Sequence, residues 1–515
     1  MTNDKFVCLV YQKDFSGKGN DRYFIYGDGR FAEVDSKSVV CCEDLIVTHD
    51  YWLIANALYR EHGRLPIRVL EITLLSRIIV GTKAIPGDVQ PWDISETIRP
   101  LYRDKGDFDR YIDMYYRRVD FKEESYMLFS HKLDEYTNNI RGAARLAGEW
   151  FRFYNVELPL FNVLSQVAAK GLRVSQPLLK EHKNNIKMDY YRTLKEFSKK
   201  HGVLCAMPSK GDIKDKLRSL DFNVDSYGVK FLVDCVPDGS GYTEDLKRLQ
   251  KLRKSFRVLG SIADSSETLR PIVETHSTST SRMYYKDPNV QNIGKRYRDI
   301  FIADDGLRLS YVDYDQFEVG IMAALSDDDN MKQIYGKADA YVDLSEAIFG
   351  DIKHRKLGKI WFLSYTYGMS IERIIDSVRL YGGDECAAMR YFSKFVAFEG
   401  WKTRLHLEIE EVGRIPTICG NYLNRRRTGE LSKKEGRSVV SHVVQGTGSF
   451  IFKSALLALS KQEDVGILIP MHDAVLIQHL EPYNVSSIVA IFQDTMTSIL
   501  DKKVVGKASI KDFCG

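Results

Sequence analysis

Two aspartates far apart in the sequence stand where they could hold metal ions together. The segment YVDYDQFEV, residues 311–319, predicts a strand that ends near Asp313, followed by a helix that carries Glu318. The segment PMHDAVLIQ, residues 470–478, predicts two apolar strands joined by a tight His-Asp turn, with Asp473 exposed at the hairpin tip. Such aspartates can share divalent ions, because carboxylate oxygens are the hard ligands that these ions prefer.

A basic helix lies between the two aspartates in the sequence. In RKLGKIWFLSYTYG, residues 355–368, four side chains recur every four residues and therefore share one face: Arg355, Lys359, Leu363 and Tyr367. Carboxylates on a sheet that face cations on a helix suggest phosphate chemistry. Singly, each feature is more typical of a turn aspartate, a solvent-facing cation pair or a core tyrosine.

The composition sets outer limits on the fold and the partners. The length of 515 residues suggests about three domains. Lys and Arg number 74 against 70 Asp and Glu, so any surface for nucleic acid must arise from local clustering of charge. One cluster is TEDLKRLQKLRKSFRVLG, residues 243–260, which predicts a helix with an apolar stripe and a basic side. A solvated helix face is the simpler explanation of that pattern.

The cysteines and the N-terminal residues bear on the compartment. The eight cysteines show no zinc-ligand spacing, so free thiols in a reducing compartment are expected. The start MTNDKFVCLVYQKDF lacks the pattern of a signal sequence, and no apolar run is long enough to span a bilayer. These features predict a soluble cytoplasmic protein without a membrane partner.

The order of carboxylate strand, basic helix and carboxylate hairpin resembles the polymerase domain of the A-family DNA polymerases. The resemblance covers about residues 158–515, and five segments carry it in the family's order. TSTSRMYYKDPNVQNI (278–293) resembles the segment ahead of the first motif, YVDYDQFEV motif A, RKLGKIWFLSYTYG motif B, VVQGTG (443–448) the primer-template contact, and MHDA (471–474) motif C. Residues 339–350, DAYVDLSEAIFG, look more like phage-type members than like the bacterial repair enzymes, and if a phage encodes the protein the cytoplasm would be that of the host cell.

The resemblance implies an α/β multidomain chain with a right-hand polymerase after an RNase H-like α/β exonuclease-type domain. The implied bounds are 1–157 for the exonuclease-like domain, 158–275 for the thumb, 276–340 and 435–515 for the palm, and 341–434 for the fingers. The helix at 243–260 resembles the thumb helix that follows the minor groove.

The exonuclease-like domain looks degenerate, because the family's acidic positions hold other residues. Tyr11 and Lys13 stand where an Asp-x-Glu pair is expected, Leu53 and Ile54 where the second acid falls, and Ile140 where the third does. The alternative is that the alignment has slipped and that nearby acids, Asp14 and Asp50, serve instead.

The resemblance also implies a role for each residue of the site. Two Mg²⁺ ions, replaceable by Mn²⁺, would be held by Asp313, Asp473 and the carbonyl of Tyr314. Lys359 would also donate a proton to the departing pyrophosphate. The nucleotide pocket would consist of Gln316, Glu318, Tyr341, Arg355, Lys359, Leu363 and Tyr367, with Glu318 beneath C2′ of the deoxyribose. Contacts to DNA would come from Arg282, Asn289, Gln291, Arg437, Gln445 and His472. Primer-template DNA and dNTPs would be the partners, with a helicase or processivity factor that no segment identifies.

Four positions depart from the family's pattern. Leu363 replaces an aromatic ring, Tyr341 a histidine, Ala474 a glutamate and Ser441 an asparagine. These changes leave open a polymerase-derived DNA-binding scaffold without catalysis. A relative of the single-subunit RNA polymerases is a further alternative, but those enzymes lack a glutamate like Glu318. The sequence therefore favours a DNA polymerase that extends a primer 3′ end and lacks proofreading.

Overall fold

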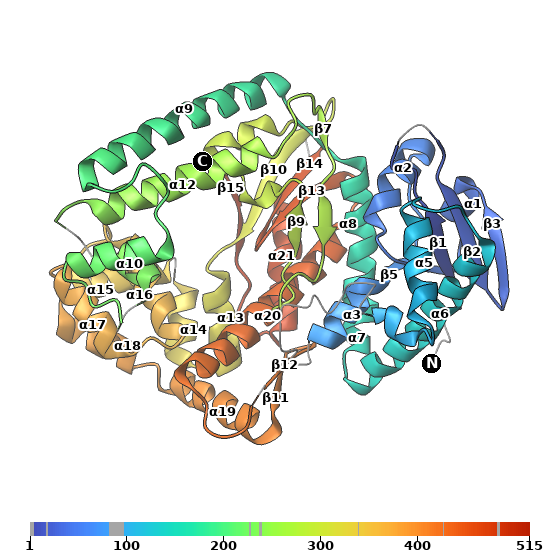
Figure 1. Ribbon diagram of the computed structural model, residues 1–515. Coiled ribbons are helices and arrows are strands. Elements are labelled where there is room, and N and C mark those ends of the chain that lie inside the picture. The colour runs from blue at the N-terminus through green and yellow to red at the C-terminus, as the bar shows by residue number, and fades with distance from the viewer. Residues whose placement is uncertain are drawn as a thin grey trace.

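The computed structural model describes residues 5–16, 19–81, 97–225, 228–235, 239–337, 339–425, 427–481 and 485–514. The N-terminal unit is built on a five-stranded sheet in the order β3-β2-β1-β4-β5 (Figure 1). Its strands are β1 (Phe6–Gln12), β2 (Arg22–Gly27), β3 (Arg30–Val34), β4 (Leu45–Thr48) and β5 (Val69–Glu71). Strand β1 pairs antiparallel with β2 and parallel with β4, which is the mixed α/β arrangement expected for this region.

Helices complete the N-terminal unit and link it to the rest of the chain. They are α1 (Ser36–Val40), α2 (Trp52–His62), α3 (Ile72–Gly81), η1 (Arg99–Leu101), α5 (Lys105–Tyr115), α6 (Glu123–Leu146), α7 (Trp150–Arg152), the π-helical turn η2 (Phe153–Glu157) and α8 (Leu158–Lys170). Helix α8 contributes Phe161 and Ala169 to the N-terminal core, and Leu160 and Leu164 to the core of the other sheet. It therefore joins the two units, and a domain boundary at 157/158 stays a prediction.

Two long helices run alongside each other in the upper left of Figure 1. These are α9 (Gln176–His201) and α12 (Tyr242–Gly260), with α10 (Lys210–Ser219) and α11 (Val229–Cys235) beyond them. The helix expected at 243–260 is confirmed. Leu249 and Leu259 on it are buried, whereas Lys251 and Lys254 are exposed, as the amphipathic pattern predicts.

The second sheet carries both aspartates of the candidate site. It has the order β13-β14-β10-β15, with every pair antiparallel. Its strands are β10 (Arg308–Tyr314), β13 (Val465–Met471), β14 (Ala474–His479) and β15 (Ala508–Lys511). Helices α20 (Lys433–Leu459) and α21 (Ser486–Ile499) pack on it. Three short strands, β7 (Thr268–Leu269), β8 (Ile272–Glu274) and β9 (Tyr284–Lys286), lead into this region.

A helical segment is inserted between β10 and β13. It comprises α13 (Phe317–Ser326), α14 (Asp329–Gly336), α15 (Ala340–Phe349), α16 (Arg355–Thr366), α17 (Ile371–Leu380), α18 (Glu385–Ser393) and α19 (Val396–Val412), followed by the hairpin β11 (Arg414–Thr417) and β12 (Gly420–Asn424). Figure 1 shows α15 to α18 opposite α9 and α12 across the centre of the molecule. None of the helices described is both long enough and apolar enough to cross a bilayer.

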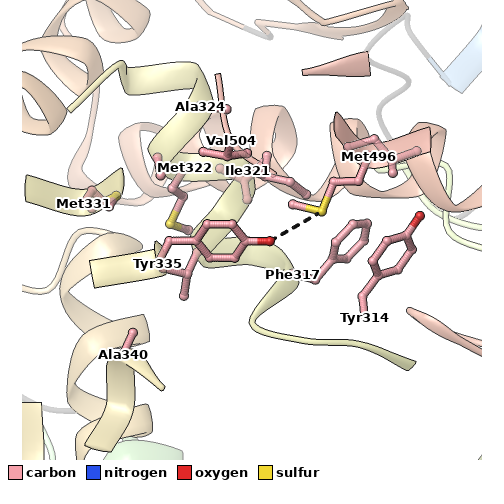
Figure 2. Packing of buried hydrophobic residues seen from close by; sticks show 14 of the residues in the cluster. Tyr314, Phe317, Ile321, Met322, Ala324, Met331, Tyr335, Ala340, Met496 and Val504 are labelled. Atoms are coloured by element: carbon pink, nitrogen blue, oxygen red, sulfur yellow. Dashed lines mark hydrogen bonds between the residues drawn. The ribbon is translucent and has the colours of Figure 1, made fainter. Parts of the chain in front are cut away.

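The turn from β10 into α13 is held by packing against Phe317 and α21. The Tyr314 ring stacks on Phe317 with centroids 4.2 Å apart, and its hydroxyl donates to the Phe492 carbonyl at 2.9 Å. Figure 2 shows these rings beside Met496 and Tyr335. Helix α13 approaches so closely that a Cβ on Gly320 would lie 2.6 Å from the Met496 methyl carbon. The backbone that carries Asp313 therefore has little freedom to move.

Candidate active site

The two aspartates lie close together, Asp313 on β10 and Asp473 in the turn that leads into the neighbouring strand β14. Asp313 pairs in register with Ala474, and the Tyr314 amide donates to the Asp473 carbonyl at 3.2 Å. His472 has φ +57°, a left-handed conformation that makes the tight turn between β13 and β14. The predicted hairpin is confirmed. The expectation that Asp473 is exposed is wrong: its side chain is half-buried, in a part of the fold where Arg282 and Lys359 come close enough to act on its charge.

The electrostatics of the pair favour a bound cation. Burial, together with the charges of Asp473 and Asp315, raises the pKa of Asp313 to about 7 against the opposing effect of Lys511 and Lys359. Burial also raises the pKa of Asp473. A buried carboxylate beside another carboxylate is disfavoured as an anion unless a cation neutralises it. The donors present are thus suited to divalent ions such as Mg²⁺, which take oxygen ligands.

Two residues near the pair were missed by the sequence analysis. The Asp315 carboxylate lies 2.6 Å from the Lys511 ammonium on β15, the strand that pairs with β10. Asp315 follows Asp313 by two residues, so the alternation of a strand could have placed both on one face. Nothing in the sequence connects Lys511 to the site, because it meets β10 only through the tertiary fold.

Helix α16 presents its predicted face toward the aspartates. Arg355 and Lys359 are exposed, and both cations lie over the Tyr341 ring at 5.5 and 5.6 Å from its centroid. Arg355 also forms an ion pair with Asp339 at 2.7 Å. A Cβ on Gly358 would lie 2.5 Å from the Tyr341 carbonyl, so glycine is needed for this approach of the two helices. The structure therefore brings the cations and Tyr341 together.

Polar side chains surround the C-terminal end of α16. Tyr367 caps the helix, and Gly368 follows at φ +91°, as expected for the residue that ends it. Burial raises the pKa of Tyr367, and the adjacent Glu318 raises it further. Arg282 donates to Glu318 at 3.2 Å, and Gln445 lies beside Tyr367.

Gln316 and Leu363 complete the set of residues assigned to the nucleotide pocket. Gln316 accepts from the Ala340 amide at 2.7 Å, so it ties the end of β10 to α15. Leu363 is half-buried and packs against the core of the second sheet. Both residues therefore border the site, and their contact with nucleotide stays a prediction.

The residues assigned to DNA differ in how accessible they are. His472 and Arg437 are exposed, and Asn289 lines a groove of about 600 Å³ with Lys254 of α12. Gln291 is buried, donating to the Pro470 carbonyl at 2.9 Å and accepting from the Tyr285 amide at 3.3 Å. Gln291 thus supports the hairpin. The DNA contacts of all these residues stay predictions.

In the N-terminal unit, the first position where the resemblance places an exonuclease acid holds Tyr11, whose hydroxyl is hydrogen-bonded inside the core. Tyr11 is fully buried, and its hydroxyl contacts the Asp50 carbonyl at 2.9 Å and the Tyr115 hydroxyl at 3.0 Å. Lys13 is paired with Asp21. Asp14 accepts from backbone amides of its own turn, including that of Gly19. Within the described part of the chain, no three His, Cys, Asp or Glu side chains gather as a metal-binding group.

Glu71 makes the stability of this unit depend on pH. It lines a cavity of about 370 Å³, and burial raises its pKa to about 7. The raised pKa means that the folded state holds this proton more tightly than the unfolded state, where the pKa is about 4.3. Stability should therefore fall as the pH rises from about 4 to about 7, by up to about 3 kcal/mol.

A Glu71→Gln variant should remove most of that loss. We expect its melting temperature to exceed that of the unmodified protein at pH 8 and to match it near pH 5. The exposed Glu124→Gln serves as the control and should leave the difference between the two pH values unchanged. An equal fall for Glu71→Gln and the unmodified protein would contradict the assignment.

Comparisons with known proteins agree with this arrangement. Residues 242–511 match the family model for DNA polymerase family A. The chain is 26% identical over 372 residues to the thermostable DNA polymerase I of Thermus filiformis, a match that covers 63% of this chain and 43% of the relative. The corresponding enzyme of Thermus aquaticus is 25% identical over 381 residues, covering 65% and 45%. The chain thus spans a little under half the length of these relatives.

A solved structure extends the likeness to almost the whole chain. The POL domain of Pol1 from M. smegmatis, in complex with DNA primer-template and dNTP, matches with a TM-score of 0.71. The match covers 98% of this chain and 94% of that one at 16% sequence identity. At that identity the likeness establishes the fold. It confirms the predicted right-hand architecture with a preceding α/β unit.

Proposed function

The chain belongs to DNA polymerase family A, and from this premise we propose that it adds dNTPs to the 3′ end of a primer as a template directs. The observation that carries the proposal is the pair Asp313 and Asp473, which are half-buried close together and influenced electrostatically by Lys359. Primer-template DNA would occupy the space between α12 and the second sheet. The polymerases of this family generally use divalent metal ions, and we propose two Mg²⁺ ions here.

In the proposed mechanism each residue acts on a defined part of the nucleotide. Asp313 and Asp473 would hold the metal ions, which supply activation of the primer hydroxyl and neutralisation of charge on the phosphates. Arg355 would leave Asp339 to bind the triphosphate, and Lys359 would stabilise and protonate the departing pyrophosphate. Tyr367 would close the pocket over the new base pair.

We propose that proofreading is absent. Tyr11 fills a position where an acid would be needed, and the acids near it, Asp14 and Asp50, are each engaged in local hydrogen bonds. The likeness of residues 339–350 to phage-type members belongs to the same proposal. The seven cysteines whose side chains are described are free, which supports a reducing compartment such as the cytoplasm.

A primer-extension assay tests the function. The protein is incubated with Mg²⁺ and an end-labelled primer on a longer template, with dNTPs in one tube and none in the other. Extension in the first tube and an intact primer in the second would support a polymerase without proofreading. Shortening without dNTPs would overturn the missing exonuclease. Bound but unextended DNA would favour the scaffold.

Glu318 is expected to select the sugar. Its side chain, fixed by Arg282, would fill the space that a 2′ hydroxyl needs. We expect Glu318→Ala to reduce the ratio of kcat/KM for a dNTP to that for the matching rNTP by roughly tenfold to two-hundredfold. The exposed Glu346→Ala on α15 is the control and should leave the ratio unchanged. An unaltered ratio in Glu318→Ala would show that another residue excludes ribonucleotides.

A further inference from the structure

Five buried side chains meet where the N-terminal unit joins the second sheet. They come from the segment α7–η2, from the loop before β9 and from α20, and each is at most 3% exposed. We call them the junction cluster: Glu149, Arg152, Glu157, Ser281 and Lys453.

Hydrogen bonds link every member of the junction cluster to at least one other member, and the His276 ring also contacts the Ser281 hydroxyl at 2.9 Å. The Lys453 ammonium donates to both Glu157 oxygens, at 2.9 and 2.7 Å, and to the Ser281 hydroxyl at 2.7 Å. Arg152 donates to Glu157 at 2.6 Å and to Glu149 at 3.0 Å. Ser281 in turn donates to Glu157 at 2.8 Å. Two anions thus face two cations, and the removal of one partner leaves an uncompensated buried charge.

The charge states of the junction cluster follow from this pairing. Lys453 and Arg152 bring the pKa of Glu157 down to about 2 despite its burial, so the carboxylate is ionised. Burial lowers the pKa of Lys453 to about 8, and Glu157 limits that fall. The cluster is therefore an ionic anchor at neutral pH.

The junction cluster holds the loop of residues 277–282 at Ser281, and Asn421 holds the same loop at the Ser279 carbonyl, to which its amide donates at 3.0 Å. Ser281 adopts a left-handed backbone at φ +59°, and its carbonyl accepts from the Ser449 hydroxyl of α20 at 2.5 Å. The loop closes on itself through the Ser277 amide, which donates to the Arg282 carbonyl at 3.0 Å. The Arg282 amide donates to the Thr278 hydroxyl at 3.1 Å. Arg282, the residue after the anchored serine, reaches Glu318 with its guanidinium.

These contacts form one continuous path from the domain junction to the nucleotide pocket. We propose that Lys453 and Glu157 are positioning residues that fix Ser281, and through it Arg282 against Glu318, so that sugar selection depends on the junction cluster. The proposal rests on the polymerase function proposed above. It gives the segment that follows the N-terminal unit a role at the active site, because η2 supplies Glu157.

Variants of the junction cluster and of α20 separate a positioning role from a general loss of stability. Lys453→Met removes the ammonium that holds Ser281, and Ser281→Ala removes the hydroxyl itself. Leu456→Ala is the matched control, since Leu456 is fully buried on the same helix but belongs to the apolar core. The double variant Glu157→Gln with Lys453→Met removes one charge of each sign. It therefore tests whether a loss of sugar discrimination in Lys453→Met comes from the uncompensated buried charge or from the loss of the contact that positions Ser281.

The first readout is sugar discrimination, with kcat and KM measured for a dNTP and the matching rNTP. We expect Lys453→Met, Ser281→Ala and the double variant to lower the discrimination ratio roughly fivefold, mainly through KM for the dNTP. Leu456→Ala should lower the melting temperature and keep the ratio. Equal loss of discrimination in Leu456→Ala, or none in Lys453→Met and Ser281→Ala, would overturn the proposal.

The second readout does not depend on catalysis. Hydrogen exchange of the amides of residues 277–282 should accelerate in Lys453→Met and Ser281→Ala and not in Leu456→Ala. Unchanged exchange in the first two variants would overturn the anchoring role. If the unmodified protein fails to extend a primer, the proposed function fails, and the exchange result still decides whether the junction cluster holds the loop.

Discussion

An Asp473→Ala variant should bind primer-template DNA and fail to extend it. Asp473 lies in the turn before β14, next to the end of β10 that carries Asp313, and in the proposed mechanism the two carboxylates would hold the metal ions. Loss of one carboxylate removes several kcal/mol of stabilisation of the transition-state charge, so kcat should fall by about a thousandfold or more. Single-nucleotide incorporation under quench-flow measures the rate, and fluorescence anisotropy of labelled DNA measures binding.

The control for this variant is Asp464→Ala. Asp464 is exposed just before β13, on the same hairpin as Asp473 but at its far end. It should retain the full rate of incorporation. Substantial extension by Asp473→Ala would rule out the carboxylate pair as the catalytic centre, and loss of DNA binding would point to a structural defect of the hairpin.

Lys359→Ala should slow incorporation by roughly a hundredfold to a thousandfold, because in the proposed mechanism Lys359 would stabilise the charge that develops on the leaving group. Lys359 acts electrostatically on both aspartates and lies over Tyr341. Lys356→Ala is the matched control, since Lys356 is exposed on the same helix but lies off the shared face. Pre-steady-state rates of single-nucleotide incorporation compare the two variants.

Lys359→Arg separates charge from proton transfer. Arginine keeps the positive charge but does not release a proton near neutral pH. If Lys359 protonates pyrophosphate, the arginine variant should recover only part of the rate lost in Lys359→Ala. Full activity in Lys359→Arg would limit the role to charge, and full activity in Lys359→Ala would exclude the residue from catalysis.

The sequence was sufficient to predict the local elements that carry the site. The structure confirms the strand with Asp313, the hairpin with Asp473 and the helix α16. Each could be predicted because its apolar and polar residues alternate with a clear period. Turn and helix patterns depend on neighbours within a few residues, which the sequence displays directly. The exposure of Asp473 was predicted wrongly, because it depends on how distant segments, including those that carry Arg282 and Lys359, approach the hairpin in the fold.

Residues whose role arises from distant contacts could not be predicted. Lys453 and Glu157 are charged, and charged residues are almost never fully buried unless paired. Their ion pair forms only because the fold brings α20 against η2. Lys511 likewise reaches Asp315 only because β15 joins the edge of the second sheet.

The pairing of β10 with β14 also constrains how the protein folds. Asp313 has its partner strand only after the whole helical insertion from α13 to β12 has been synthesised, since β14 begins at Ala474. Contacts between segments so distant in the chain form slowly, because a long loop must close before they stabilise the fold. During translation, β10 should therefore remain without its partner strands β14 and β15 until these have been synthesised, and its apolar residues should be exposed. A nascent chain that stalls before Ala474 should lack a catalytic centre and be prone to aggregation.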